Sequence, residues 1–459
     1  MSRCAPALSH VALVALMMTA PLAIAAGVAT TTQADPAHPT ITSPRIAALS
    51  REIAAGNRAA AEAFWRERDQ VTPLVEPIAD DPTCSWVTFA WRGDADTRRV
   101  GLIGGPVIHD FSKWLDRLGD SDVWYRTERI PNDARFLYSF QVDRPAAWPT
   151  DPAKAEAAFK QYLPRPDPLN PCTEYDASVL ELPDAPPQPW ATRVPGMTPT
   201  ASKLWSKIPG VPRGASRSHV IRSDILKQDR RVDVYLPIGY DPRADKPYKL
   251  LVLFEGSGVN ELLDNLAVQQ RMPPVVMAVP HFVNRNAECE CSEPFADFVA
   301  DELLAWLRDH YRVSAAREDV IVGGFSYSGL AAGFCAFRHP VKLGNVLTMS
   351  ASYWWFPESN TPAAAFRGEP GWLTREYVRA PLPTHPPRFF LAAGRFEDYY
   401  PWSLLAENRR IRDVLAAKGY AVEFREFTGG HEPVSWRSAM VEGLIALTRE
   451  GNAANDAGQ

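Results

Sequence analysis

The sequence predicts two folded domains: an all-β sandwich, then an α/β domain whose mostly parallel sheet is covered by helices on both faces. Three observations predict this architecture. The first half has short aromatic runs separated by Gly, Asp and Pro turns, a pattern typical of a β-sandwich. In the second half, apolar runs alternate with amphipathic helical patterns, as in a doubly covered parallel sheet. Eight prolines between Glu181 and Pro212 separate the halves, because proline sustains neither a helix nor a central strand.

Composition excludes several classes of protein. The 459 residues include 49 Lys and Arg against 54 Asp and Glu, a net charge of −5. This balance argues against a dedicated nucleic-acid binder, which would carry a basic excess. With 46% hydrophobic and 22% charged residues, the chain is globular. The 42 prolines, roughly twice the usual share, indicate a loop-rich protein and not a coiled coil or helical bundle.

The first 25 residues are expected to be a signal peptide. Arg3 gives a positive start, an apolar run covers residues 11–24, and Ala23-Ile24-Ala25 has the small residues of a cleavage site. The run is too short to span a bilayer comfortably, and no later stretch predicts a membrane anchor. We therefore expect a periplasmic or secreted mature protein.

The domain limits follow from these patterns. Residues 26–50 are expected to be a disordered lead-in, 51–180 the N-terminal β-sandwich domain with a short initial helix over 51–65, 181–212 a Pro-rich linker, 213–450 the α/β domain, and 451–459 a disordered tail. The strands expected in the first domain are 86–91, 100–103, 122–125 and 136–140. In the second domain we expect strands at 231–237, 249–254, 274–279, 319–324, 346–350, 389–392 and 422–427, and helices at 295–310 and 404–418.

The cysteines predict no metal site. Cys289 and Cys291 are too close in sequence for a zinc pair, and Cys335 fits a helix core. Cys84 and Cys172 either form a disulfide or remain thiols. No ligand cluster predicts a metal, and no glycine-rich loop after a strand predicts a nucleotide, so we expect no cofactor.

Residues 319–330 read as a strand, a tight turn and a helix. The turn contains the pattern G-x-S-x-G, with Gly324 two residues before Ser326 and Ser328 in place of the last glycine. Such a turn exposes the Ser326 hydroxyl above the sheet and directs the Tyr327 N–H at a developing oxyanion. The alternative interpretation is a glycine-rich turn with an ordinary helix-capping serine.

The remaining groups for nucleophilic catalysis follow in the expected order. His431 lies in a loop directly after a predicted strand and could act as general base. An acid should precede it at a strand end, where Glu397 and Asp398 are both candidates that spacing does not separate. A second oxyanion donor is expected from the N–H of Gly256 or Ser257, after an earlier strand. Together these features predict a serine hydrolase with the α/β-hydrolase fold.

The chain resembles the enterochelin (enterobactin) esterase family over roughly residues 51–450. In the C-terminal half the matching stretches are 251–256, Arg285-x-x-Glu288-x-x-Cys291, 324–332, 350–355, Gly394-x-x-Glu397, 429–431 and Trp436-Arg437. In the N-terminal half they are 122–124, 167–171 and Leu182-Pro183-x-x-Pro186. The resemblance implies hydrolysis of the ester bonds of a catecholate trilactone siderophore, with the iron-loaded siderophore as partner. It also implies an immunoglobulin-like N-terminal sandwich.

The resemblance further implies roles for individual residues. It favours Glu397 over Asp398 as the acid, and it makes Arg285 a candidate for binding catecholate oxygens. Trp354, Trp355 and Trp436 would either form flat walls for catechol rings or pack in the core.

Two departures from the family pattern leave the substrate open. A signal peptide is unexpected, since relatives with this N-terminal domain are described as cytoplasmic. Glu255 replaces the family's Asp before Gly256, and Ser328 replaces a glycine, both beside the reacting atoms. One alternative is therefore a feruloyl- or acetyl-xylan-type carbohydrate esterase of the same fold. The other is a non-catalytic binding protein.

Overall fold

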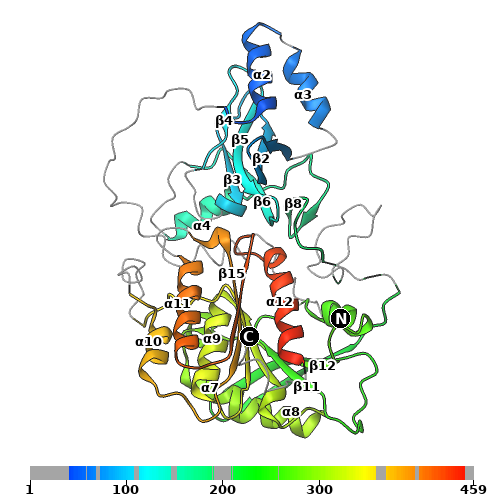
Figure 1. Ribbon diagram of the computed structural model, residues 1–459, viewed down its shortest axis with the longest axis vertical. Helices are drawn as coiled ribbons and strands as arrows, with labels where there is room; N and C mark the ends of the chain where they lie inside the picture. Colours follow the sequence, from blue (N-terminus) through cyan, green and yellow to red (C-terminus); the bar gives the residue numbers. More distant parts are fainter. Residues whose placement is uncertain are drawn as a thin grey trace.

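The structure is a computed structural model, and it places the two domains at opposite ends of its long axis (Figure 1). It describes residues 41–57, 59–68, 73–107, 113–145, 152–188, 190, 208, 210–256, 258–357, 369–398 and 403–449. The predicted signal peptide and the predicted tail lie outside the described residues. None of the described helices is long and apolar enough to cross a membrane.

The described chain begins with two helices, α2 (Pro44–Ala54) and α3 (Ala60–Arg68). Ser43 caps α2 by accepting a hydrogen bond from the Ile46 N–H, and a proline follows at the first helical position. Ile46 and Leu49 are fully buried. The expectation of a disordered lead-in through residue 50 was therefore wrong in its last residues, because this cap and apolar face order the chain from Pro44. The single helix expected over 51–65 is likewise two helices, separated at Gly56 with φ +84°.

Two four-stranded antiparallel sheets follow. One has the order β1-β2-β5-β4, with β1 (Leu74–Ile78), β2 (Asp81–Arg92), β5 (Val123–Pro131) and β4 (Asp116–Arg117). The other has the order β3-β6-β8-β7, with β3 (Val100–Gly104), β6 (Arg135–Val142), β8 (Ala177–Glu181) and β7 (Thr173–Glu174). Phe89, Leu102 and Phe140 belong to one core that both sheets share.

The N-terminal domain also contains helices. Besides α2 and α3 it has α4 (Pro152–Gln161), so the prediction of an all-β domain is not confirmed. An immunoglobulin-like topology stays a prediction. Cys84 and Cys172 are both free thiols, which decides the open alternative between them against a disulfide.

The second domain is built on an eight-stranded sheet with the order β16-β15-β14-β13-β11-β12-β10-β9. The strands are β9 (Ala215–Ser223), β10 (Gln228–Leu236), β11 (Lys249–Leu253), β12 (Val275–Pro280), β13 (Val320–Phe325), β14 (Asn345–Met349), β15 (Arg388–Gly394) and β16 (Val422–Phe427). The six strands from β16 to β12 are parallel, whereas β10 and β9 run antiparallel at one edge. The predicted mostly parallel sheet is confirmed, and the strand β9 was not foreseen.

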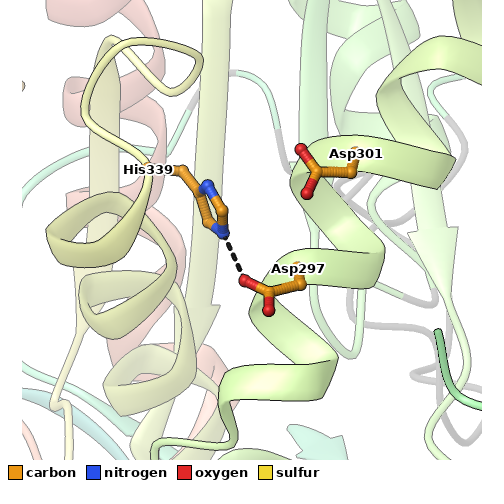
Figure 2. A group of neighbouring side chains, drawn as sticks. All are labelled: Asp297, Asp301 and His339. Carbon is orange, nitrogen blue, oxygen red and sulfur yellow. Dashed lines mark hydrogen bonds and ion pairs between the residues drawn. The ribbon is translucent and has the colours of Figure 1, made fainter.

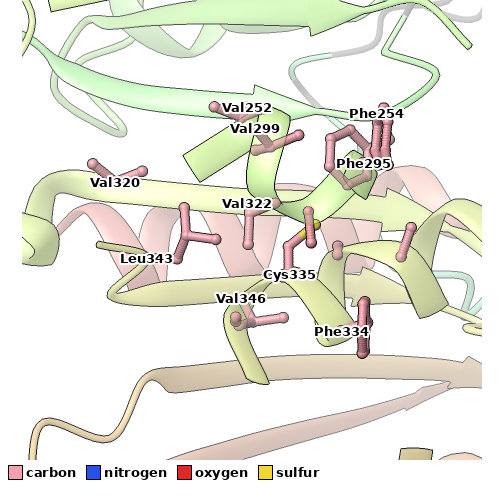
Figure 3. Close-up of a cluster of buried hydrophobic side chains, with 14 of the residues drawn as sticks. Val252, Phe254, Phe295, Val299, Val320, Val322, Phe334, Cys335, Leu343 and Val346 are labelled. Carbon is pink, nitrogen blue, oxygen red and sulfur yellow. The ribbon is translucent and has the colours of Figure 1, made fainter. Parts of the chain in front are cut away.

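Helices cover both faces of this sheet, and alternate residues of each strand supply the two cores. In β11, Leu250 and Val252 face one core, while Leu251 and Leu253 face the other. The second core packs under α5 (Asn260–Val268) and α12 (Pro433–Thr448). The first core, part of which Figure 3 shows around Cys335, packs under α6 (Arg285–Cys289), α7 (Glu293–Asp297), the π-helical η2 (Phe298–Leu303), α8 (Leu304–His310), α9 (Ser326–Arg338), α10 (Trp372–Arg379) and α11 (Leu404–Ala417).

The parallel arrangement positions the predicted site residues. Because β11, β13, β14, β15 and β16 run in the same direction, their carboxyl ends meet at one edge of the sheet. The segments that carry Gly256, Ser326, Glu397 and His431 all follow these ends. Ligand sites of open parallel sheets lie at this edge.

Candidate active site

Ser326 is the first residue of α9 and directly follows β13. Its φ of +54° lies in the left-handed region, where a residue with a side chain is strained. This conformation turns the chain from strand to helix within one residue, as a nucleophile elbow requires. The strand–turn–helix context expected for Ser326 is therefore present.

Small residues around Ser326 permit the turn. A Cβ on Gly324 would lie 2.4 Å from the carbonyl oxygen of Ser328, so no larger residue fits there. Ser328 is fully buried, and its hydroxyl accepts from the Phe325 N–H at 2.9 Å and donates to the Phe325 carbonyl at 2.8 Å. The serine that replaces the expected last glycine thus supplies hydrogen bonds that close the turn.

Glu397 and His431 form a buried pair. The Nδ1–H of His431 donates to Oε1 of Glu397 at 2.5 Å. The His431 side chain is 3% exposed, and the Glu397 side chain is 0% exposed. Glu397 ends the short η5 helix (Arg395–Glu397) after β15, and His431 follows the neighbouring strand β16. A carboxylate on Nδ1 fixes the imidazole with Nε2 available as a base.

Asp398 points elsewhere. It is exposed, and its carboxylate accepts a hydrogen bond from the hydroxyl of Ser403 at the start of α11. Of the two acids that spacing left open, Glu397 is therefore the one that contacts His431.

Ser350 and Trp436 hold the second oxygen of Glu397 in place. Oε2 accepts from the Ser350 hydroxyl at 2.7 Å and from the Gly394 N–H at 2.6 Å. The Trp436 indole N–H donates in turn to the Ser350 hydroxyl at 2.8 Å, and its ring meets the His431 ring edge to face at 4.9 Å. No role for Ser350 can be predicted from the sequence, since one serine after a strand carries no signal. Its φ of +49° in the structure is the mark of a special position.

The hydroxyl of Ser326 lies 3.5 Å from the hydroxyl of Ser352, which is buried. The Ser352 N–H also donates to the Ser326 carbonyl at 3.0 Å. A hydrogen bond from Ser326 to His431 is not formed between these described residues. Catalytic hydrogen bonds are often long before substrate binds, so the arrangement is compatible with base catalysis.

Two of the expected oxyanion donors can be placed: Tyr327 directly follows Ser326 in the elbow, and Gly256 lies beyond the end of the neighbouring strand β11. Gly256 follows β11, which pairs with β13, and the Phe254 N–H donates to the Gly323 carbonyl at 2.9 Å. A Cβ on Gly256 would lie 2.8 Å from the Leu253 side chain. Ser257, the other candidate, lies outside the described residues.

Arg285 lies near the elbow but is already paired. Its guanidinium forks onto the Glu255 carboxylate, with Nε–Oε1 at 2.5 Å and Nη2–Oε2 at 3.0 Å. It also lies 5.9 Å from the ring centre of Tyr327, which meets Trp354 edge to face at 5.8 Å. The pair with Glu255 raises the pKa of Arg285 against the opposing effect of burial. Arg285 and Trp354 thus remain candidates for substrate contact.

The other two tryptophans are packed inside the protein. Trp355 is 7% exposed and Trp436 is 5% exposed, and they belong to different hydrophobic cores. Neither presents the open ring face that a catechol wall needs, so the core-packing alternative holds for both. Trp436 contacts the site through Ser350 and His431.

Glu432 is a buried acid that sequence analysis did not single out. It is fully buried, and burial raises its pKa from 4.5 to about 7, although hydrogen bonds from Ser435 and from the Gly430 and Leu137 backbone oppose the rise. The Ser435 hydroxyl lies 2.5 Å from Glu432 Oε1 and 3.1 Å from the Arg135 carbonyl. The single Ser435 hydroxyl proton is shared between these two acceptors, so its support for a charged Glu432 is weak and burial dominates.

One group of described side chains has the spacing of a metal site: Asp297, Asp301 and His339 (Figure 2). Its charges are already compensated, because Arg338 forks onto Asp297 and Lys342 pairs with Asp301. His339 directly follows α9, at the end opposite Ser326. The group is best explained as an ion-pair network away from the catalytic edge.

Both domains match known families. Residues 223–447 match the family model described as a putative esterase, and residues 86–191 match the model for the N-terminal domain of enterochelin esterase.

Individual relatives match across both domains. An iron(III) enterobactin esterase from Dickeya dadantii is 27% identical, covering 84% of this chain and 93% of the relative. The crystal structure of a ferric enterobactin esterase from Salmonella typhimurium matches with a TM-score of 0.65 at 25% identity, covering 84% of this chain and 98% of that one. A structure of the Shigella flexneri enterobactin esterase in the presence of enterobactin matches with a TM-score of 0.63 at 25% identity, over 84% and 97% of the two chains.

Ser350→Ala should lower kcat by about tenfold and leave KM within about twofold, because Glu397 loses a donor that orients it. Steady-state kinetics on a chromogenic ester measures this. The matched control is Ser403→Ala, which removes the hydroxyl that contacts the neighbouring Asp398 and should leave kcat unchanged. Equal kcat values for the two variants would contradict the role of Ser350.

Glu432→Gln should change how stability depends on pH. Between about pH 4.5 and 7 the folded protein binds a proton at Glu432 that the unfolded chain releases, so this group lowers stability as pH rises through that window. The difference in free energy of unfolding between Glu432→Gln and wild type should therefore shift in favour of the variant by up to about 3 kcal/mol between pH 5 and pH 8. Urea unfolding at both pH values measures this, with the exposed Glu442→Gln as control. Parallel pH curves for wild type and Glu432→Gln would refute the assignment.

Proposed function

This chain belongs to the enterochelin esterase family, and we propose that it hydrolyses the ester bonds of a catecholate trilactone siderophore and so releases its iron. It is an esterase, and the siderophore is the substrate that best fits its two-domain organisation. The observation that carries the proposal is the joint occurrence, in one chain, of a Ser326, His431 and Glu397 site and the N-terminal domain of this family. Relatives that match this chain across both domains include iron(III) enterobactin esterases and an iron(III) salmochelin esterase.

The reaction would follow nucleophilic acyl transfer. Nε2 of His431 takes the proton of Ser326 as its oxygen attacks a lactone carbonyl, and the N–H groups of Tyr327 and Gly256 stabilise the oxyanion. Collapse of this intermediate expels the serine alkoxide of the siderophore, which takes the proton from His431. Water then hydrolyses the acyl-enzyme by the same route. Glu397 stabilises the charged imidazole in both steps.

Arg285 and Trp354 are the proposed substrate contacts. Glu255 engages two of the five N–H donors of Arg285, so the guanidinium is held in a fixed orientation while further donors remain for catecholate oxygens. The Trp354 and Tyr327 rings, in contact beside Ser326, suit an aromatic substrate. A ferric catecholate is anionic, which favours the iron-loaded siderophore.

We also propose that the mature protein acts in the periplasm or outside the cell. The support is in the sequence: a positive start, an apolar run over residues 11–24 and a small-residue cleavage site.

The mature protein should convert ferric enterobactin into linear dihydroxybenzoyl-serine oligomers, which chromatography resolves. Ser326→Ala should retain less than about a thousandth of this activity, because the nucleophile and base act as a unit. Release of ferulate from methyl ferulate with the trilactone intact would contradict the siderophore assignment and favour the carbohydrate-esterase alternative. A Ser326→Ala variant that keeps most of its activity would instead contradict the elbow assignment.

A further inference from the structure

The N-terminal domain touches the two loops that carry the catalytic acid and base. We call residues 131–135 the β5–β6 turn, residues 395–398 the acid loop and residues 428–432 the base loop. The turn and the start of β6 contact both loops, and α12 also packs against β6. The domain interface therefore lies directly beside the Glu397–His431 pair.

Three hydrogen bonds join the turn to the base loop and to the helix after it. The Arg135 N–H donates to the Thr428 carbonyl at 3.1 Å, and the Thr428 hydroxyl donates to Asp133 Oδ2 at 2.9 Å. The Ser435 hydroxyl lies 3.1 Å from the Arg135 carbonyl. Gly429 permits this approach, since a Cβ there would come within 2.9 Å of the same carbonyl. The absence of a side chain at Gly429 therefore lets the base loop pack closely against the N-terminal domain.

The acid loop is held by the same part of the N-terminal domain. The Phe396 ring, one residue before Glu397, meets the Phe136 ring edge to face at 5.6 Å. Arg395 Nη1 lies 3.6 Å from Asp133 Oδ2. The two loops are also bonded to each other, since the Phe396 N–H donates to the Gly429 carbonyl at 3.1 Å. The turn, the acid loop and the base loop therefore form one connected unit.

We propose that the N-terminal domain positions the catalytic acid and base through the β5–β6 turn, with Asp133 and Thr428 as positioning residues. Apart from the short η5 helix, the acid and base loops have no regular structure to hold Glu397 and His431 at their separation. Catalytic groups must be held within about 0.5 Å of productive geometry. Docking of the N-terminal domain supplies that restraint, so this domain serves the chemical step as well as any contact with substrate.

Other bonds across the same interface provide a comparison. Gln188 Nε2 donates to the Ser438 hydroxyl at 2.8 Å, and Arg437 pairs with Glu174 at 2.6 Å. These bonds reach α12 beyond the base loop. They can hold the two domains together without contacting the acid loop or the base loop. Removing one of them therefore shows how much weaker domain docking by itself changes activity.

The inference rests on the serine-esterase chemistry of the proposed function and not on the siderophore as substrate. A small chromogenic ester and a fluorophosphonate probe therefore suit the test, since both report on Ser326 and His431. Failure to cleave ferric enterobactin would leave this test intact.

The full-length mature protein is compared with Thr428→Val, which keeps the side-chain shape but removes the hydroxyl, and with Asp133→Ala on the other side of the same bond. Each should lower kcat on p-nitrophenyl acetate, and the rate of fluorophosphonate labelling, by about tenfold with KM within about twofold. Thr428→Ser, which keeps the hydroxyl, should restore both rates. The melting temperature of each variant is measured alongside.

Ser438→Ala is the matched control, because it removes an interdomain hydrogen bond of the same kind away from both loops. It should keep the kcat and labelling rate of wild type. Wild-type rates in Thr428→Val or Asp133→Ala would overturn the proposal. An equal loss of kcat in Ser438→Ala would overturn it too, because general docking would then explain the effect.

Discussion

The hydrogen bond between the Nδ1–H of His431 and Glu397 is the interaction on which the site depends, and the sheet makes it possible. Strands β15 and β16 are parallel neighbours, with Gly394 opposite Phe427 at their carboxyl ends. The residues that follow the two strands must therefore meet at one edge. With β13 two strands away from β15, Ser326 reaches the same edge from its elbow.

Neighbouring groups restrict the orientations that Glu397 and the His431 ring can adopt around this bond. Ser350 and the Gly394 N–H occupy the second oxygen of Glu397, and Trp436 both supports Ser350 and packs against the imidazole. A buried carboxylate needs such donors, since leaving a charged oxygen without hydrogen bonds in the protein interior costs free energy. The N-terminal domain extends the same restraint to the loop backbone. The catalytic edge is thus a product of both domains.

The sequence predicted the parts of this site that leave a local signal. The elbow has one in Gly324 and the residues around Ser326, and His431 follows a glycine pair after an apolar strand. Glu397 and Asp398 could not be separated, because adjacent residues in a tight turn point in different directions that only the tertiary fold decides.

Other parts of the site could not be predicted. Ser350, Glu432 and Thr428 gave no signal, since each acquires its role from a partner far away in the sequence. Trp355 and Trp436 were open for the same reason, because aromatic residues suit a core and a binding wall equally. Strands β4 and β7 have two residues each, which is too short to show the alternation of apolar and polar residues that predicts a strand.

The most direct test of the account compares Glu397→Gln with Asp398→Asn. Each change removes one negative charge and keeps the side-chain shape, and the two residues are adjacent in the chain. Steady-state hydrolysis of p-nitrophenyl acetate should show kcat reduced roughly a hundredfold or more in Glu397→Gln, because the histidine loses the carboxylate that fixes its tautomer. Asp398→Asn should remain within about twofold of wild type. Comparable losses in the two variants, or wild-type kcat in Glu397→Gln, would contradict the account.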